Sequence, residues 1–393
     1  MDQQTLSRII SGRLEDVVWE SFSDADWKLL EYAAQREGVA PLVYWAFTRA
    51  EKFAYLPQAM RNFLHASYVS TRFQNEKNFE ELGVLSQLFA QAEIPIVALK
   101  GVCFALTIYP DVGLRPMGDI DVLIPSSRLT DAVQIAKTLG YTDGKPEVAP
   151  GLRNLLNHEV CLQKTGLLST TLELHKGLVA SKAFSYAVPV NWFWTQTEPL
   201  ADATQTRFQN LLMLTPVAQV LYAAVHAVLQ HGGQHTPLCW YYDLDQLMRH
   251  YDERMDWELL LSQAKTFEWG TALGTALSMT CSYFETPIPD GVRTSLLKHT
   301  DRHQQLVAFK QTHFTTHILE ELQTLMSLSW YGRFRLVLGL IAPSPAYMRW
   351  RYRLKHAWTV PVYYPIRWWG ILKDAVRTLI LLSKNLLSGV ICA

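Results

Sequence analysis

The chain has 393 residues, of which 49% are hydrophobic and 12% aromatic, and its formal net charge is zero. This composition excludes a disordered chain, the length suffices for two or three packed domains, and the neutral charge argues against an extended nucleic-acid track. Five widely spaced cysteines without a C-x-x-C pair argue against a disulfide scaffold or a structural zinc site. No secretory signal is visible at the N-terminus, so we expect a cytoplasmic protein.

Residues 1–92 are predicted to form an N-terminal helical region. Apolar residues recur at three- and four-residue spacing over 24–37 and over 56–92, and few Gly or Pro residues interrupt either run. The second run predicts one long packing helix or a pair of helices.

A small α/β core is predicted over residues 93–200, where the period of the apolar residues changes. Residues 94–99 form a short apolar run that predicts a buried strand, followed by a turn at Lys100-Gly101. Helical spacing then resumes over 102–109.

The next segment, 110–118, is a loop by its Pro and Gly content, and it leads into an alternating run over 118–124. Successive side chains of a strand point to opposite faces, so Asp119 and Asp121 share one face while apolar neighbours point into the core. Two adjacent carboxylates repel each other and are costly to bury, so this face predicts a divalent cation.

Two further elements complete the predicted core. Ser126 or Ser127 is expected to cap a helix that stops at Gly140. Residues 158–163 and 170–178 then form two strand-like runs joined by a polar turn.

Alternation in the second of these runs places Glu173 and His175 on one face. Carboxylate oxygens suit hard cations, and two metal ions about 3.5–4 Å apart can activate an attacking oxygen and stabilise the leaving one at phosphorus. Asp119, Asp121 and Glu173 therefore predict a catalytic site for two Mg²⁺ ions, with Mn²⁺ as an alternative.

Helical spacing returns in a predicted helical domain, residues 201–300. An apolar helix face runs from Leu211 to Val225, and two amphipathic segments follow at 242–249 and 257–267. The predicted fold class is therefore α+β, with a small mixed-sheet core embedded in mostly helical domains.

The last region, 301–393, is predicted to be basic, rich in aromatic residues and helical, with prolines cutting it into pieces at positions 343, 345, 361 and 365. Its segment 331–393 contains ten Lys or Arg and one acid, Asp374, so it carries +9 and the rest of the chain −9. Three interpretations stay open: a helical cap on the acidic body, contact with a membrane surface or an acidic partner, and single-stranded nucleic acid. The charges argue against a spanning helix.

The residues at 99–101, 109–117, 118–124 and 172–175 together resemble the nucleotidyltransferase superfamily typified by DNA polymerase beta. The chain is more closely similar to a bacterial family known only as uncharacterised nucleotidyltransferases, over about residues 90–285. The resemblance implies Mg²⁺-dependent transfer of a nucleotidyl group from an NTP. Asp119 and Asp121 would be the metal ligands and Glu173 the carboxylate that helps to activate the acceptor hydroxyl.

One position departs from the superfamily pattern. The superfamily opens its nucleotide site with Gly-Ser or Gly-Gly, whose backbone N–H groups approach the phosphates, whereas this chain has Gly101-Val102. We expect Lys100 and Arg115 to compensate by pairing with phosphate oxygens; the alternative is that both are solvated or pair with the acids. His175 is expected to orient Glu173, to contact a phosphate, or to be satisfied within the core.

Three other histidines admit a zinc interpretation, namely His226, His231 and His235, but the second and third lie at a predicted helix end and loop. We favour instead that His226 and Asp243 tie helices together or line the floor of a cleft.

The sequence thus predicts a nucleotidyltransferase that moves an NMP group from an NTP to an unidentified acceptor hydroxyl and releases pyrophosphate. The predicted location is the cytoplasm, and peripheral contact with the inner membrane surface is a further expectation. Two alternatives remain. One is a non-catalytic nucleotide- or anion-binding assembly protein with a basic docking tail, and the other is a metal hydrolase that uses water as the acceptor.

Overall fold

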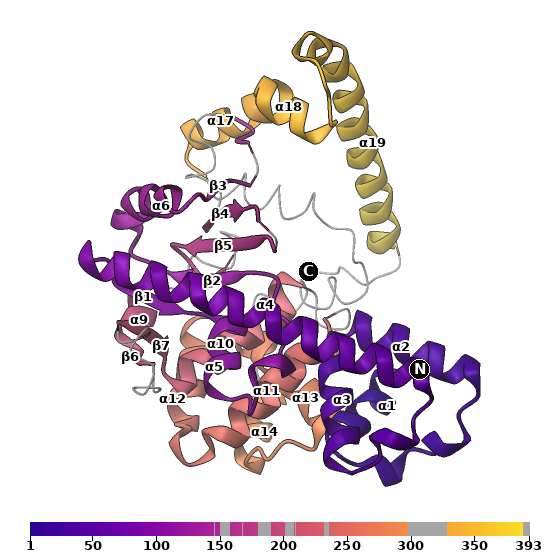
Figure 1. Cartoon of the computed structure of the whole chain (residues 1–393). Coiled ribbons are helices and arrows are strands. Elements are labelled where there is room, and N and C mark those ends of the chain that lie inside the picture. Colours follow the sequence, from indigo (N-terminus) through magenta and orange to yellow (C-terminus); the bar gives the residue numbers. More distant parts are fainter. Residues whose placement is uncertain are drawn as a thin grey trace.

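A seven-stranded mixed sheet lies at the centre of the protein, with helices packed around it (Figure 1). The computed structural model describes residues 1–144, 146–149, 158–166, 168–179, 190–200, 208, 210–231, 236–297 and 328–387. The strands are β1 (Ile96–Ala98), β2 (Ile120–Leu123), β3 (Thr142–Asp143), β4 (Glu159–Lys164), β5 (Thr170–His175), β6 (Thr197–Pro199) and β7 (Leu211–Leu214). Their order in the sheet is β3-β4-β5-β2-β1-β7-β6, which confirms the predicted α+β class.

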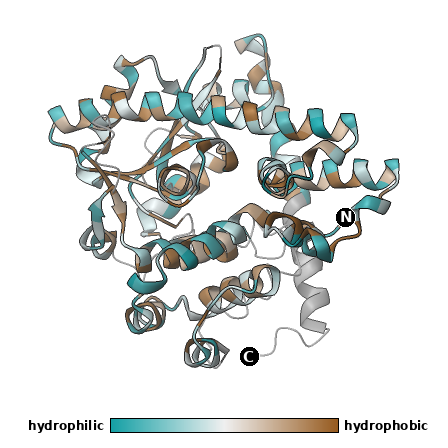
Figure 2. Cartoon of the chain, turned by 60° about the horizontal axis from the view of Figure 1, so that its bottom comes forward, coloured by the Kyte–Doolittle hydropathy of each residue, from teal (hydrophilic) through white to brown (hydrophobic). Residues whose placement is uncertain are grey.

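The described helices precede, interrupt and follow these strands. They are α1 (Gln3–Ile10), α2 (Asp24–Arg36), α3 (Ala40–Arg49), α4 (Gln58–Gln91), α5 (Lys100–Thr107), α6 (Leu129–Thr138), α9 (Val190–Thr195), α10 (Pro216–Val225), α11 (Leu238–His250), α12 (Trp257–Thr266), α13 (Gly270–Phe284), α14 (Asp290–Leu297), α17 (Trp330–Ile341), α18 (Pro345–Arg351) and α19 (Val360–Leu387). A π-helical turn, His226–Gln230, continues α10. Hydrophobic and hydrophilic residues alternate along many of these helices, as amphipathic packing requires (Figure 2).

The central strands explain how the acidic residues come together. All four residues of β2 are buried, because neighbouring elements cover both faces of this strand. β2 runs antiparallel to β1 and parallel to β5, and its pairing with β5 sets Asp121 opposite Glu173 and Leu123 opposite His175.

Helix α4 supports the loop that leads into β2. The predicted run over 56–92 is one 34-residue helix, which packs against α3 and α6 and crosses the molecule in Figure 1. The side-chain amide of Asn75 donates hydrogen bonds to the carbonyl oxygens of Val112 (2.6 Å) and Arg115 (2.8 Å). The position of this loop therefore depends on a helix that ends before the sheet begins.

The predicted helical face that begins at Leu211 is wrong over its first residues. Leu211 to Leu214 form β7, which pairs in parallel with β1, with Leu211 opposite Ile96. The helix starts only at Pro216, whose fixed φ and missing N–H suit the first turn of α10. A run of four apolar residues has no period that distinguishes a strand from a helix, and the pairing with β1 makes this run a strand.

Three smaller predictions also fail. Ser126 and Ser127 lie in a 3₁₀ turn, and α6 starts after them without a side-chain cap. The predicted turn at Lys100-Gly101 is instead the first turn of α5. Pro365 lies inside α19, so it does not cut the C-terminal segment at that position.

One hydrophobic cluster joins buried residues of the N-terminal helices, the sheet and helices α10 to α14. A second, small cluster lies outside it, in which Leu328 and Leu336 pack with Val148, Ala149 and Leu340. The domain boundaries that the sequence suggests at 92, 200 and 300 stay predictions. Among the described residues, every helix is too short or too polar to cross a membrane.

Candidate active site

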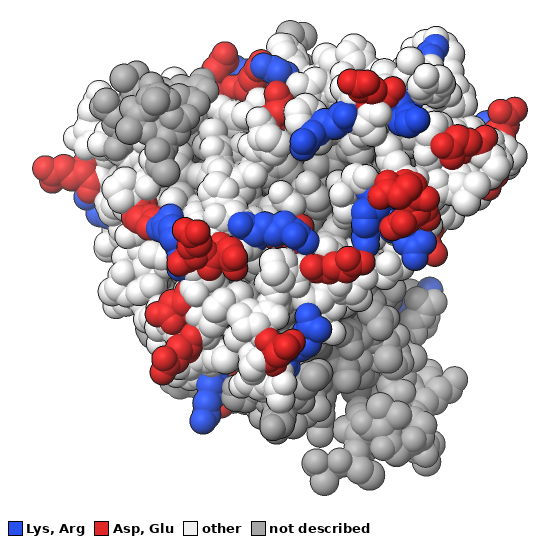
Figure 3. All heavy atoms as spheres, turned by 90° about the horizontal axis from the view of Figure 1, so that it is seen from below, with Lys and Arg blue, Asp and Glu red and all other residues white. Residues whose placement is uncertain are grey.

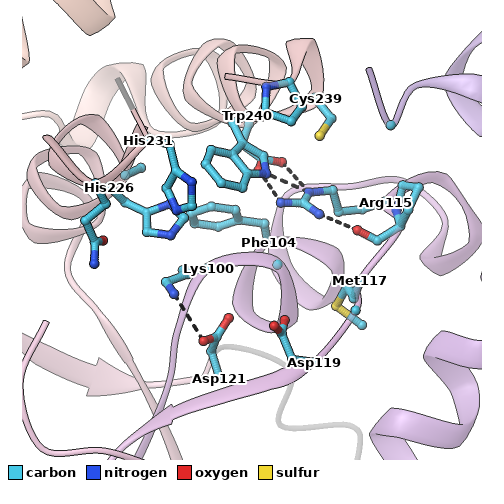
Figure 4. A pocket seen from close by; sticks show the side chains of 18 of the residues that line it. Lys100, Phe104, Arg115, Met117, Asp119, Asp121, His226, His231, Cys239 and Trp240 are labelled. Carbon is cyan, nitrogen blue, oxygen red and sulfur yellow. Dashed lines mark hydrogen bonds and ion pairs between the residues drawn. The ribbon is translucent and has the colours of Figure 1, made fainter. Parts of the chain in front are cut away.

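A cavity of about 590 Å³ opens between the sheet and the helices α10 and α11. Its lining combines α5, the loop before β2, β2 itself, β4, β5, α10, the π-helical turn and α11. Figure 4 shows the two aspartates of the Asp-x-Asp motif on one side of this cavity and the helix residues on the other. The lining includes Lys100, Gly101, Phe104, Arg115, Met117, Asp119, Asp121, His158, Glu159, Glu173, Tyr222, His226, Gln230, His231, Trp240 and Asp243.

The three predicted catalytic acids lie together in this cavity. Asp119 directly precedes β2 and Asp121 lies within it, so strand alternation gives both the same face. Glu173 joins them because the parallel register of β2 and β5 places it opposite Asp121. Burial, together with the negative charges of Asp121 and Glu173, raises the pKa of Asp119 to about 7.

Two cations hold Asp121 ionised. Burial alone would raise the pKa of this carboxyl, but Lys100 and His175 lower it well below its usual value. Lys100 Nζ lies 3.1 Å from Asp121 Oδ1, and His175 Nε2 lies 2.7 Å from the same oxygen. Asp121 is thus neutralised within the protein, whereas Asp119 forms no ion pair in the described part of the chain.

Lys100 is held in an unusual backbone conformation at the start of α5. Its φ of 47° lies in the left-handed region, which residues other than glycine rarely adopt and which is found disproportionately at functional sites. Its ammonium group also lies 5.7 Å from the centre of the Tyr222 ring. The neighbouring carboxylates and Tyr222 outweigh its burial and raise the pKa of Lys100, so the group stays positive at neutral pH.

His175 connects these three acids to a fourth, Glu159, which was not predicted from the sequence. Its ring is fully buried, and Nε2 lies 3.6 Å from Glu173 Oε2 while Nδ1 lies 3.5 Å from Glu159 Oε2. Burial lowers the pKa of His175, but the hydrogen bonds with Asp121 and Glu173 raise it to about 9. The side chains of His175 and Glu173 therefore share one face of β5, as predicted.

Glu159 and His158 could have been found from the predicted hairpin. The antiparallel ladder of β4 and β5 pairs Glu159 with His175, and His158 Nε2 lies 3.0 Å from Glu159 Oε2. Once the turn between the two strands is placed, this register follows from counting residues back along β4. Burial raises the pKa of Glu159, yet His158 and His175 lower it to about 2.

The donor atoms in the cavity fit a divalent cation. Asp121, Glu173 and His175 each offer one ligand atom, and these atoms lie within 4.8 Å of one another; His158, Glu159 and His175 form a second such group. Carboxylate oxygens suit Mg²⁺ and Mn²⁺, and an added imidazole nitrogen suits transition metals. Asp119 has a raised pKa and forms no ion pair among the described residues, so a bound cation would supply it with a counter-charge.

Arg115 is engaged by a partner other than the predicted phosphate. Its Nη2 lies 2.7 Å from Asp243 Oδ2 and its Nε lies 2.9 Å from Asp243 Oδ1, while its Nη1 donates to the carbonyl of Pro116. The Tyr109 hydroxyl donates to Asp243 Oδ1 at 2.7 Å. The sequence predicted that Asp243 ties helices together or lines the floor of a cleft. In the structure this buried cluster joins the loop before β2 to α11, and Asp243 also lines the cavity.

Gly101 allows the start of α5 to pack closely against the same loop. A Cβ atom at this position would lie 3.2 Å from Met117 Cγ and 3.4 Å from Arg115 Nη1. A larger residue would push against the loop that carries Asp119. The structure thus gives Gly101 a packing role, while its predicted contact with phosphate stays a prediction.

The helices form an imidazole and indole wall opposite the acids (Figure 4). The rings of His226, His231 and Trp240 lie within 4.5–4.7 Å of one another, measured between centroids. Burial and the nearby Lys100 lower the pKa of His226 well below its usual value, so this ring stays neutral. Neither His226 nor His231 belongs to a metal-binding group of the described residues, and His235 lies outside them.

The sequence model of a protein family described as "Uncharacterised nucleotidyltransferase" matches residues 23–285. No curated protein and no solved structure matches the chain. The matched segment contains every residue that lines the cavity, and it ends before α17 begins.

Proposed function

The chain belongs to this family of uncharacterised nucleotidyltransferases, and on that premise we propose that it transfers an NMP group from an NTP to an acceptor hydroxyl. The acceptor oxygen would attack the α-phosphorus, the bond between the α-phosphorus and the bridging oxygen would break, and pyrophosphate would leave. The observation that carries this proposal is the convergence of Asp119, Asp121 and Glu173 in one cavity. We also propose the wider relationship to the polymerase-beta superfamily, and a bacterial, cytoplasmic setting.

The metal site would be built by the same acids. Asp119, Asp121 and Glu173 would hold two divalent ions, with Mg²⁺ as the physiological ion and Mn²⁺ as a substitute. When bound, such ions neutralise charge on the phosphates and lower the pKa of a coordinated hydroxyl. Glu173, the more exposed partner of Asp121 in the sheet, would accept the proton of the acceptor hydroxyl.

Other residues of the cavity would position these groups. His175 would orient Asp121 and Glu173 through its Nε2 atom, and Glu159 would hold the other side of its ring. Lys100 would leave Asp121 for a phosphate oxygen when a cation takes its place, since a flexible ammonium group can exchange one oxygen partner for another. Arg115 would act by holding the loop in place through Asp243.

Binding of labelled NTPs tests the proposal. The wild-type protein should bind an NTP only with Mg²⁺, and Asp121→Asn should lose that binding. Asp131→Asn, on the exposed side of α6, is the matched control and should bind like the wild type. An α-³²P-labelled NTP and candidate acceptors would then reveal transfer of the label. Equal binding by all three proteins without Mg²⁺ would overturn the proposed site.

One observation favours a second candidate. The pair between Lys100 and Asp121 neutralises a predicted metal ligand within the protein, as a non-catalytic anion-binding scaffold would. Such a scaffold should bind NTP without Mg²⁺ and transfer nothing. A hydrolase would instead release the nucleotide to water, which thin-layer chromatography of the labelled products separates from transfer to an acceptor.

A further inference from the structure

Helix α17 turns its apolar stripe toward solvent. Trp330, Phe334, Leu338 and Ile341 follow one another at the three- and four-residue spacing of one helix face, and all four are exposed, Trp330 to 79%. An amphipathic helix in a globular protein normally buries this face against the core. The buried residues of α17 include only Leu336 among its larger side chains.

Helix α19 repeats the arrangement. Val362, Ile366, Trp369, Leu372 and Val376 again share helical spacing, and all are exposed, Trp369 to 69%. The two stripes are part of a concentration of apolar surface in one region. Of the 22 exposed large hydrophobic side chains in the described chain, 15 lie between residues 330 and 376. Such a concentration of exposed apolar side chains is typical of an interaction surface.

The same region carries a large excess of positive charge, with Asp374 as its one acid. Six exposed basic side chains belong to it, and the sequence has no Asp or Glu from residue 330 to 373. These side chains are Arg333, Arg349, Arg351, Arg353, Lys355 and Lys373. The face of the body seen from below differs, because Lys and Arg there alternate with Asp and Glu (Figure 3).

The C-terminal helices are anchored on the sheet side of the body. Ser344 Oγ donates to the carbonyl of Glu147 and its backbone N–H donates to the carbonyl of Val148, both at 2.6 Å. Leu328 and Leu336 pack with Val148 and Ala149, which follow β3. In Figure 1 the helices α17 and α18 lie above β3 and β4, and α19 lies outside the helices that surround the sheet.

We propose that α17 to α19 dock on the surface of a membrane that is rich in anionic lipid. The two apolar stripes would enter the boundary between head groups and acyl chains, where Trp and Tyr side chains are favoured. The exposed Arg and Lys side chains would pair with lipid phosphates. A second copy of the chain fits this surface poorly, because α17 to α19 contain many basic residues and a single acid, Asp374, so two such faces repel each other. No described helix can span the bilayer, so the helices would lie along it.

Flotation of the full-length protein with vesicles tests this proposal. It should float with vesicles of phosphatidylcholine and phosphatidylglycerol, remain behind with phosphatidylcholine alone, and release from the anionic vesicles as salt screens the charges. The pair Arg349→Gln and Arg351→Gln should weaken binding about fivefold for each charge removed. Trp330→Ala combined with Trp369→Ala should abolish flotation, whereas Tyr55→Ala, which removes an aromatic ring 74% exposed on the body, should leave it unchanged.

Three results would overturn the proposal. One is equal flotation with both kinds of vesicle, and another is equal loss from Tyr55→Ala. The third is an absence of flotation. If light scattering then shows a dimer that Trp369→Ala dissociates, this face is an interface between copies; a monomer that does not float overturns the proposal equally. Each variant should still bind NTP as the wild type does. This separates the failure of the membrane proposal from misfolding and from the failure of the proposed enzymatic function.

Discussion

The acid cavity and the C-terminal helices depart from ordinary packing in opposite ways. In the cavity, charged groups such as Asp121 and Lys100 are largely withdrawn from water, whereas on α17 and α19 large apolar groups such as Trp330 and Trp369 face water. Folding by itself favours neither arrangement, because burying a charge costs free energy and an exposed apolar side chain contributes little to the stability of the fold. We take each departure as the mark of something that the chain binds.

The two regions also differ in how far the protein compensates for the departure. In the cavity the buried charges have partners, as Arg115 has Asp243 and Asp121 has Lys100 and His175. Asp119 forms no ion pair within the described part of the chain. On the C-terminal helices the apolar stripes have no cover within the described chain. The following variants are ordered from the largest expected effect to the smallest, and each can sharpen or break this contrast.

Removing the buried partner of Arg115 should have the largest effect. Asp243→Ala leaves a buried guanidinium without its counter-charge, so we expect the free energy of unfolding to fall by about 3–5 kcal/mol in urea titration followed by circular dichroism. Asp131→Ala, which breaks an exposed pair with Arg128, should cost less than about 1 kcal/mol. Equal losses in the two variants would contradict the account of the cavity as compensated charge.

Glu173→Gln should damage the reaction more than the binding. If Glu173 accepts a proton in nucleotidyl transfer, the single-turnover rate should fall by about 10²–10⁴-fold while binding of the NTP with Mg²⁺ persists. Glu253→Gln, at an exposed position, serves as the control and should keep the wild-type rate. A rate for Glu173→Gln within twofold of the wild type would remove Glu173 from the mechanism.

Asp119 should make the metal-free protein less stable as pH rises. The pKa of Asp119 is about 7 in the folded protein and near 4 in the unfolded chain. Between pH 4 and pH 7 the folded protein therefore keeps a proton that the unfolded chain has already released. The stability of the wild type should therefore fall from about pH 4 to pH 7 relative to Asp119→Asn. The variant should be more stable by about 4 kcal/mol at pH 8, because the two pKa values differ by about three and a difference of one corresponds to about 1.4 kcal/mol, and the two proteins should agree at pH 4.

Divalent metal gives the complementary test of Asp119. Mg²⁺ should raise the melting temperature of the wild type at pH 8 more than that of Asp119→Asn, because a ligand that binds only the folded state stabilises it. If the stability difference between the wild type and Asp119→Asn changes with neither pH nor Mg²⁺, the Asp119 carboxyl does not carry the uncompensated charge.

The smallest effect on stability is expected on the C-terminal helices. Trp369→Ala should change the free energy of unfolding by less than about 0.5 kcal/mol, because the ring is exposed. Trp269→Ala removes a fully buried ring of the main core and should cost about 3–5 kcal/mol. A large loss from Trp369→Ala would show that this face is covered within the protein, and the contrast between the regions would disappear.

Several features of the site could be predicted from local patterns alone. Alternation in residues 118–124 placed Asp119 and Asp121 on one face, and alternation in β5 placed Glu173 beside His175, because a strand repeats every two residues whatever lies next to it. The hairpin of β4 and β5 follows in the same way from a short connection. The sequence left open whether the C-terminal segment covers the body or contacts a membrane surface, since the spacing of apolar residues is the same on a buried face and on an exposed one.

The tertiary structure determined which residues and strands become partners of these local elements. The sequence by itself determined which residues alternate and where the acids lie, because those depend on neighbours in the chain. Only the fold paired β2 with β5, turned Leu211 to Leu214 into a strand beside β1, and brought Asp243 to Arg115 across 128 residues. Such partners are selected by the packing of the whole core, which no short stretch of sequence records.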